Sequence, residues 1–190
     1  MDQNRTKRGR VQLILIMLAF IGPLLLASWM YFGHNWQPSG RTNHGVLLDP
    51  IVSLWDELPS SPLVALSADH WLMAYANSTP CDDECRETLH LLRQSRLVLG
   101  NKMTRVLRVF LHGDSPPDKV FLEERQQGLI TIRDDGLFRL LTESSPGALK
   151  PDGIYLVDPL GNLVMYFPPD LDPGDMVDDI KHLLQFSRIG

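Results

Sequence analysis

An apolar run near the N-terminus constrains this chain more than any other feature of its sequence. The segment Val11–Phe32 (VQLILIMLAFIGPLLLASWMYF) contains no charged side chain. A helix of about 20 apolar residues crosses the hydrocarbon core of a bilayer, so this run is long enough to span a membrane. Trp29, Tyr31 and Trp36 lie at its far end, where amphipathic rings favour the headgroup layer. We therefore expect a transmembrane anchor over residues 11–32.

The residues before this run set its expected orientation. The first ten residues include four basic side chains, Arg5, Lys7, Arg8 and Arg10. Because positive charge favours the cytoplasmic side, residues 1–10 are expected to be a cytoplasmic tail, with the rest of the chain exported. The apolar run is longer than the core of a signal peptide and no A-x-A-like site follows it, which predicts an uncleaved anchor. A bacterial inner membrane with a periplasmic domain fits best, and a mitochondrial inner membrane is the alternative.

The charge of the exported part excludes one class of partner. The first ten residues carry a net charge of +3 and the whole chain carries −5, which leaves −8 beyond residue 10. Binding to nucleic acid phosphates needs clustered Lys and Arg side chains, so no nucleic-acid partner is expected. The length of 190 residues suffices for one domain with accessory segments, since domains usually have roughly 100–150 residues.

Beyond the anchor, the sequence divides into a tether and a domain. Residues 33–62 are rich in Pro, Gly, Ser and Asn, which predicts a tether with one short turn at residues 53–58. Residues 63–190 alternate between strand and helix patterns. Strands are expected at residues 71–76, 105–112, 129–132, 153–158 and 162–167, the last two forming a hairpin, and helices at residues 82–99, 114–127, 137–142 and from Asp172 onward. This order predicts an α/β fold with a mixed sheet and flanking helices on both faces.

The chain's two cysteines follow the first strand expected in this domain. Cys81 and Cys85 are spaced Cys-x-x-x-Cys and lie at the start of the next expected helix. A helix N-terminus stabilises a thiolate through its unpaired N–H groups and its dipole. Two thiolates held close together either form a reversible disulfide or bind Cu(I), which prefers soft ligands. A strand that delivers two cysteines to a helix start is typical of thioredoxin-like redox and copper-carrying proteins, and we expect a thioredoxin-like fold.

Two groups of acidic residues lie near these elements. Asp82, Asp83 and Glu84 stand between the cysteines, and their negative charge opposes thiolate formation at Cys81. Our hypothesis is that these thiols are less acidic than those of strongly oxidising proteins of this fold, which favours a reductant or a metal-transfer role. The second group is expected to be a solvated helix face and cap, and it consists of Asp170, Asp172, Asp175, Asp178 and Asp179.

These motifs together resemble the Sco/SenC family of membrane-anchored, thioredoxin-fold proteins, and more narrowly its short Sco-like proteobacterial members. The matching features are the anchor, Gly40-Arg-Thr-Asn-His-Gly-Val-Leu-Leu-Asp-Pro50, Cys81-Asp-Asp-Glu-Cys85, Ile154-Tyr-Leu-Val-Asp-Pro-Leu-Gly-Asn-Leu163 and the closing Ser187-Arg-Ile-Gly190. The resemblance implies a part in copper insertion into cytochrome c oxidase. It also implies that both cysteines bind copper and that the partner is an oxidase subunit or assembly factor.

One ligand implied by the resemblance has no counterpart in this sequence. The family's copper site includes a histidine just before the Tyr-Leu strand, where this chain has Leu149-Lys150-Pro151-Asp152. Two thiolates and an imidazole hold Cu(II) as well as Cu(I), whereas two thiolates alone favour Cu(I). His112 is a candidate substitute, because it ends a strand and strand C-termini border the ligand crevice of open α/β sheets. A solvated histidine at a strand end is the alternative interpretation.

The expected function follows from the thiol pair and the anchor. We expect a membrane-anchored accessory protein of cytochrome c oxidase biogenesis, acting either as a thiol–disulfide reductant or as a Cu(I) carrier. In the reductant version Cys81 attacks a target disulfide and Cys85 resolves the mixed disulfide. One alternative is a non-catalytic interaction module with an inert cysteine pair. Another is a general periplasmic disulfide oxidoreductase, and the sequence leaves open whether the protein is an enzyme.

Overall fold

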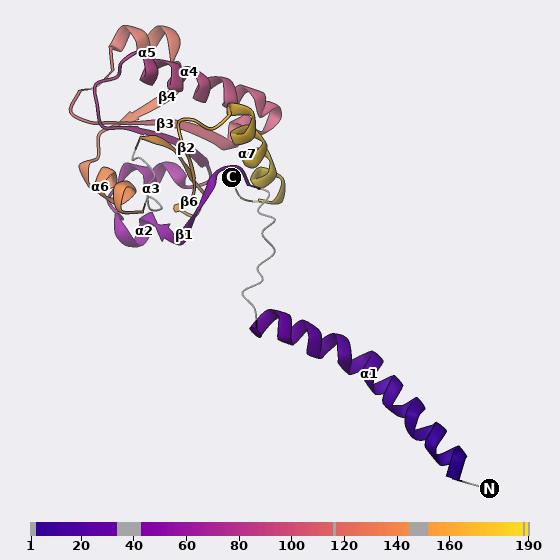
Figure 1. The fold of residues 1–190 in the computed structure, drawn as a ribbon. Helices are drawn as coiled ribbons and strands as arrows, with labels where there is room; N and C mark the ends of the chain where they lie inside the picture. Colours follow the sequence, from indigo (N-terminus) through magenta and orange to yellow (C-terminus); the bar gives the residue numbers. More distant parts are fainter. Residues whose placement is uncertain (1–2, 34–42, 116, 145–151, 188, 190) are drawn as a thin grey trace. The chain divides into compact units, whose positions relative to one another are not determined.

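The computed structural model describes residues 3–33, 43–115, 117–144, 152–187 and 189, which fall into two compact units divided after Thr42. The first unit contains the helix α1 (Gln3–Gly33), drawn in indigo in Figure 1. Its segment Arg10–Trp29 is long and apolar enough to cross a membrane, in agreement with the expected span of residues 11–32. Pro23 lies inside the helix, a position that membrane helices tolerate.

The second unit is built on a six-stranded mixed sheet with the order β1-β6-β5-β2-β3-β4. The strands are β1 (Val46–Ser53), β2 (Trp71–Asn77), β3 (Val106–His112), β4 (Leu129–Ile132), β5 (Gly153–Val157) and β6 (Asn162–Phe167). The neighbours β2, β3 and β4 run parallel, whereas β5 and β6 form a hairpin that joins β2 and β1 through antiparallel pairs. Because β2 lies in the middle of the sheet, all seven of its residues are buried.

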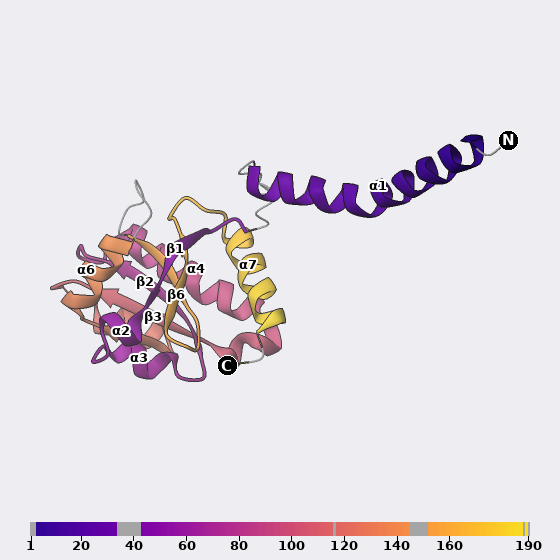
Figure 2. The same cartoon turned by 90° about the horizontal axis from the view of Figure 1, so that it is seen from below.

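Helices cover both faces of this sheet (Figures 1 and 2). They are α2 (Leu54–Glu57), α3 (Pro62–Ser67), α4 (Asp83–Val98), α5 (Lys119–Arg125), α6 (Asp135–Ser144) and α7 (Pro173–Phe186), and a 3-10 helix, η1 (Gly100–Arg105), follows α4. Alternate residues of β2 serve the two faces. Met73 and Tyr75 pack with apolar residues of α4 and α7, while Leu72 and Ala74 pack with those of α2, α3 and α6.

Most of the expected elements are present, and the expected α/β class with a mixed sheet and flanking helices is confirmed. The segment expected to be a tether differs, because within it the structure contains β1, α2 and the first residue of α3. β1 is an edge strand with several exposed residues, Pro50 and a register shift against β6, so it lacks the regular alternation by which a strand is recognised. α5 is shorter than expected and begins at Lys119, after the N-cap Asp118.

The acidic run of α7 is only partly solvated, which corrects the expectation from sequence. The Asp179 side chain is 5% exposed. Its Oδ2 accepts hydrogen bonds from the backbone N–H groups of His44 at 2.9 Å and Gly45 at 2.8 Å. The His44 ring lies between two carboxylates, with Nδ1 3.3 Å from Asp179 Oδ1 and Nε2 3.6 Å from Asp175 Oδ1. Asp179 therefore fixes the segment leading into β1 against α7.

Candidate functional site: a disulfide at the start of α4

The cysteines lie where the central strand β2 leads into α4. β2 ends at Asn77, and α4 begins at Asp83 with Asp82 as its N-cap. The Asp82 carboxylate accepts a hydrogen bond from the Cys85 backbone N–H at 3.0 Å, which satisfies one of the unpaired donors of the first helical turn. The cap thus fixes the backbone of the second cysteine.

Cys81 and Cys85 form a disulfide, with 5.1 Å between their Cα atoms. The two residues differ in exposure. Cys85 is 1% exposed and belongs to the apolar core beneath α4, whereas Cys81 is half-buried and packs against the edge of that core. A partner molecule can therefore reach the sulfur of Cys81 more readily than that of Cys85.

A network of polar side chains fixes the loop that carries Cys81. Asn77 Oδ1 accepts two hydrogen bonds from Thr79, one from its backbone N–H at 2.8 Å and one from its hydroxyl at 2.7 Å. Asn77 Nδ2 donates to the Tyr75 hydroxyl oxygen at 3.5 Å. Asn77 is 5% exposed, whereas its partner Thr79 is exposed, so these hydrogen bonds lie at the boundary between the core and the solvent. This network connects the last residues of β2 to the residues just before the disulfide.

Tyr75, like Asn77, is a buried polar residue of this region. Burial raises the pKa of its hydroxyl above the ordinary value for tyrosine, and the nearby carboxylates of Asp152 and Glu84 add to this effect. Hydrogen bonding to Thr88 and Asn77 acts in the opposite direction. The Tyr75 ring stacks on Phe110 of β3, with 5.5 Å between ring centroids. Tyr75 is therefore a neutral hydrogen-bonding group at physiological pH.

The loop that leads to Cys81 is also held by a close contact between its backbone and the backbone that follows β3. Gly113 follows β3, and a Cβ atom at this position would collide with the carbonyl oxygen of Ser78. The Gly113 N–H donates to the Asn77 carbonyl at 3.2 Å. Glycine is thus required where the end of β3 meets the loop that leads to Cys81.

His112 lies at the same edge of the sheet as the cysteines, since it pairs with Asn77 in the β2–β3 register. Its Nδ1 donates to the Gly113 carbonyl at 2.8 Å, which leaves Nε2 as the ring atom with a lone pair. Within the part of the chain that the structure describes, no three His, Cys, Asp or Glu side chains lie close enough together to hold a metal ion. His112 as a copper ligand therefore stays a prediction. Leu149, Lys150 and Pro151 lie outside the described residues.

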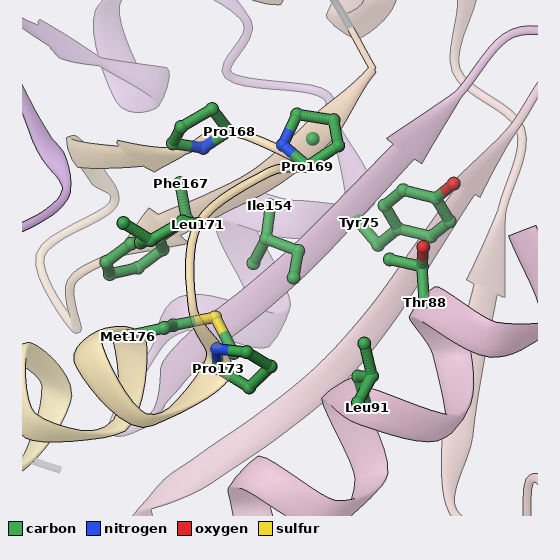
Figure 3. A pocket seen from close by; sticks show the side chains of 11 residues that line it. Tyr75, Thr88, Leu91, Ile154, Phe167, Pro168, Pro169, Leu171, Pro173 and Met176 are labelled. Carbon is green, nitrogen blue, oxygen red and sulfur yellow. The ribbon is translucent and has the colours of Figure 1, made fainter. Parts of the chain in front are cut away.

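A small pocket opens beside α4 on the face that α7 also covers (Figure 3). Its volume is about 40 Å³, and Thr88 and Leu91 of α4 form one wall. The opposite wall comes from Phe167 at the end of β6 and from the loop that follows it, with Ile154 of β5 between the two walls. The Tyr75 and Thr88 hydroxyls lie side by side at its polar end.

Sequence reasoning identified the cysteines but missed the residues that support them. Tyr75 lies within residues 71–76, which were recognised only as a buried strand, and Asn77 directly follows them. Thr88 was one polar position on an amphipathic helix. The one available hint was Asn77 at the end of an apolar strand, because a buried amide must find hydrogen-bond partners.

Comparison with known families identifies both parts of the chain. The family described as "Transmembrane-like, thioredoxin-like, C-terminal domain" matches residues 71–187, and its N-terminal companion, "Transmembrane-like, N-terminal domain", matches residues 3–34. The chain belongs to this transmembrane-like, thioredoxin-like family. The match at residues 3–34 supports a membrane anchor in α1. No curated protein matches the sequence.

Solved structures with the same fold include Sco proteins. Arabidopsis thaliana ScoI, solved with copper bound, superposes with a TM-score of 0.51 at 18% identity, covering 65% of this chain and 89% of that one. Yeast Sco1, also solved with copper bound, gives a TM-score of 0.51 at 20% identity, covering 65% of this chain and 81% of that one. At these identities the likeness shows a shared fold. The transmembrane-like, thioredoxin-like chain therefore has the Sco-type architecture that its motifs predicted.

Proposed function

We propose that this protein is a thiol–disulfide reductant, anchored in a bacterial inner membrane with its domain in the periplasm, that serves cytochrome c oxidase biogenesis. The observation that carries the proposal is the Cys81–Cys85 disulfide at the start of α4, with one accessible and one buried residue. An accessible cysteine can attack a large target, while a buried neighbour can resolve the intermediate. The oxidase assignment rests on the sequence motifs that resemble the short Sco-like proteins lacking the ligand histidine.

The proposed reaction transfers two electrons to a target disulfide. In the reduced protein, the Cys81 thiolate attacks one target sulfur, forming a mixed disulfide and releasing the other target sulfur as a thiolate. Cys85 then loses its proton and attacks the Cys81 sulfur, which releases the second target sulfur. The target gains a dithiol and the protein gains the disulfide seen in the structure. An external dithiol must return the protein to its reduced form.

A Cu(I) carrier is the second candidate, because the same two sulfurs are soft ligands. Two thiolates suit Cu(I) without a third protein ligand, whereas Cu(II) binding gains from an imidazole. The described residues supply the two sulfurs but no third clustered ligand, which favours Cu(I) over Cu(II) as the cargo. A partner's ligand or His112 would complete the coordination during transfer.

Two measurements on the reduced full-length protein in detergent separate these candidates. Equilibration with a series of dithiothreitol ratios gives the reduction potential of the cysteine pair, and anaerobic competition with a Cu(I) chelator gives the metal affinity. A reversible couple with weak Cu(I) binding supports the reductant. Tight one-to-one Cu(I) binding that the Cys81→Ser, Cys85→Ser double variant loses supports the carrier.

The double variant also tests the interaction module. If the cysteines are an inert pair, cells that carry the double variant in place of the wild-type protein assemble active oxidase normally. The thiol hypotheses predict loss of the oxidase copper centre in those cells. Turnover of unrelated disulfide substrates with equal efficiency would instead indicate a general oxidoreductase.

A further inference from the structure

The pocket beside α4 lies close enough to the disulfide to contact the same target molecule. Cys85 and the wall residues Thr88 and Leu91 share one helix. A helix rises 1.5 Å per residue, so Thr88 and Leu91 lie about 5–9 Å along the axis from Cys85. The Cα atom of the reactive Cys81 lies a further 5.1 Å from that of Cys85. The pocket residues Tyr75, Ile154 and Met176 belong to the same core cluster as Cys85. An extended peptide covers the distance from these wall residues to Cys81 in about two to four residues.

The volume of the pocket suits a single side chain and not a whole small molecule. A volume of about 40 Å³ accommodates a few carbon atoms, far less than the several hundred Å³ of a site for a drug-sized ligand. Three proline rings, Pro168, Pro169 and Pro173, form part of its wall. Because proline fixes the backbone, this wall needs little ordering when an occupant binds.

Four acidic residues lie next to residues that line the pocket. Asp170 and Asp172 flank the wall residue Leu171, and the carboxylates of Glu84 and Asp152 lie near the Tyr75 hydroxyl. Among the residues that the structure describes, none of these four carboxylates forms an ion pair, and Asp172 caps α7 by accepting a hydrogen bond from the Gly174 N–H at 2.6 Å. The apolar pocket is complementary to an apolar side chain. Negative charge without an ion-pair partner is complementary to Lys or Arg residues next to that side chain.

From these three observations we propose that the pocket docks the target polypeptide. It receives one aliphatic side chain, such as leucine or methionine, that lies two to four residues from the target's reactive cysteine and has basic neighbours. This inference rests on the proposed thiol chemistry for its biological meaning and adds to it a class of substrate. The aliphatic side chain would fill the pocket while the neighbouring carboxylates attract the flanking cations.

Direct binding tests the pocket without any thiol reaction. The full-length oxidised protein is placed in nanodiscs of zwitterionic lipid, and fluorescence polarisation follows a labelled peptide that contains Lys-Leu-Lys and has serine in place of cysteine. Replacing the peptide's leucine by alanine, or its lysines by glutamate, is expected to weaken binding about tenfold or more. Added salt should weaken the wild-type interaction as well.

A matched pair of variants locates the binding site. Leu91 lines the pocket and is 36% exposed, whereas Leu97 lies further along the same helix and is 48% exposed. Leu91→Lys should reduce peptide affinity about tenfold, because it places a cation at the apolar wall, and Leu97→Lys should leave it within about twofold. Equal affinity for both variants, equal affinity for the leucine and alanine peptides, or binding to empty nanodiscs would each overturn the proposal.

A kinetic experiment separates failure of the pocket from failure of the proposed function. With a disulfide-bonded version of the peptide, Leu91→Lys should raise KM about tenfold and leave kcat unchanged, and exchange with oxidised glutathione should not change. Normal glutathione exchange with no effect of Leu91→Lys on the peptide rejects the pocket alone. Absence of exchange with both substrates rejects the reductant, while the polarisation result still decides the pocket.

Discussion

One oxygen of Asn77 accepts both the backbone N–H and the hydroxyl of Thr79, at 2.8 and 2.7 Å. This pair of hydrogen bonds fixes the loop between the central strand and Cys81. Asn77 is buried and Thr79 is exposed, so removing the Asn77 amide detaches the loop from the end of the strand while water replaces the lost partner of Thr79.

The variant Asn77→Ala is therefore expected to lose about 1–3 kcal/mol of unfolding free energy, as measured by urea denaturation. It should also slow the reaction of reduced Cys81 with a target disulfide, because the loop is no longer held. Thr79→Val is the matched control, since it removes only the hydroxyl bond and should cost about 1 kcal/mol. Equal stability of Asn77→Ala and wild type would contradict the role given to this side chain.

Asp82 both caps α4 and places negative charge next to Cys81. Asp82→Ala should cost about 1 kcal/mol through loss of the N-cap bond to the Cys85 N–H. Asp82→Asn keeps an equally good cap while removing the charge, so in the reduced protein it should make Cys81 react faster with iodoacetamide at neutral pH. Asp178→Asn, on the exposed face of α7, serves as the control for charge alone. An unchanged alkylation rate in Asp82→Asn would show that the acidic residues do not restrain the thiol.

The central part of the fold could be predicted from the sequence, because the local propensities of its residues agree with the packing that they adopt. β2 is a continuous apolar run, and α4 begins with a good cap and ends before Gly100, which has a positive φ of 60°. β1 was missed because its pairing with β6 involves residues more than a hundred positions apart, and its own sequence contains proline and exposed residues. An edge strand that is held by long-range pairing and is exposed over much of its length need not show a regular alternation of apolar and polar residues.

The position of the cysteines could likewise be predicted from the sequence, but the residues that support them could not. Thiols at a strand–helix junction have one recognisable arrangement, whereas Tyr75, Asn77 and Thr88 become neighbours only after the sheet and α4 have packed together. The burial of Asp179 has the same explanation. Within an acidic helix, sequence alone does not show which carboxylate faces a distant backbone segment, here Gly45.

The buried carboxylate of Asp179 should contribute strongly to stability. Asp179→Ala removes the acceptor for the His44 and Gly45 N–H groups and is expected to cost about 2–3 kcal/mol, since these hydrogen bonds are charge-assisted. Asp179→Asn should give an intermediate loss, because an amide oxygen can still accept one of them. Urea denaturation with Asp178→Ala as control measures the difference. A loss in Asp178→Ala as large as that in Asp179→Ala would mean that overall charge, and not the buried contact, is responsible.

Tyr75 should make stability depend on pH in the alkaline range. Burial raises the pKa of Tyr75, so the folded state retains the proton at pH values where the unfolded chain releases it. The hydroxyl's contribution is therefore fully present below the unfolded pKa of about 10 and is lost as pH rises through the higher folded value. The difference in unfolding free energy between wild type and Tyr75→Phe should be constant from pH 7 to about 9 and shift against the wild type above pH 10. A pH-independent difference would indicate that the hydroxyl is not desolvated.

His112 allows a test of which copper state the thiol pair can hold. Its Nδ1 is committed to the Gly113 carbonyl, so only Nε2 can coordinate a metal, and two thiolates satisfy Cu(I) without it. If His112 joins the site, His112→Ala should weaken Cu(II) binding by about tenfold or more and change Cu(I) affinity far less. The readouts are the sulfur-to-Cu(II) charge-transfer absorption and anaerobic Cu(I) competition, with His182→Ala as control because that ring contacts Phe186 on α7. An unchanged Cu(II) spectrum in His112→Ala would remove His112 from the site. The described protein ligands would then be the two cysteines alone, the set that favours Cu(I).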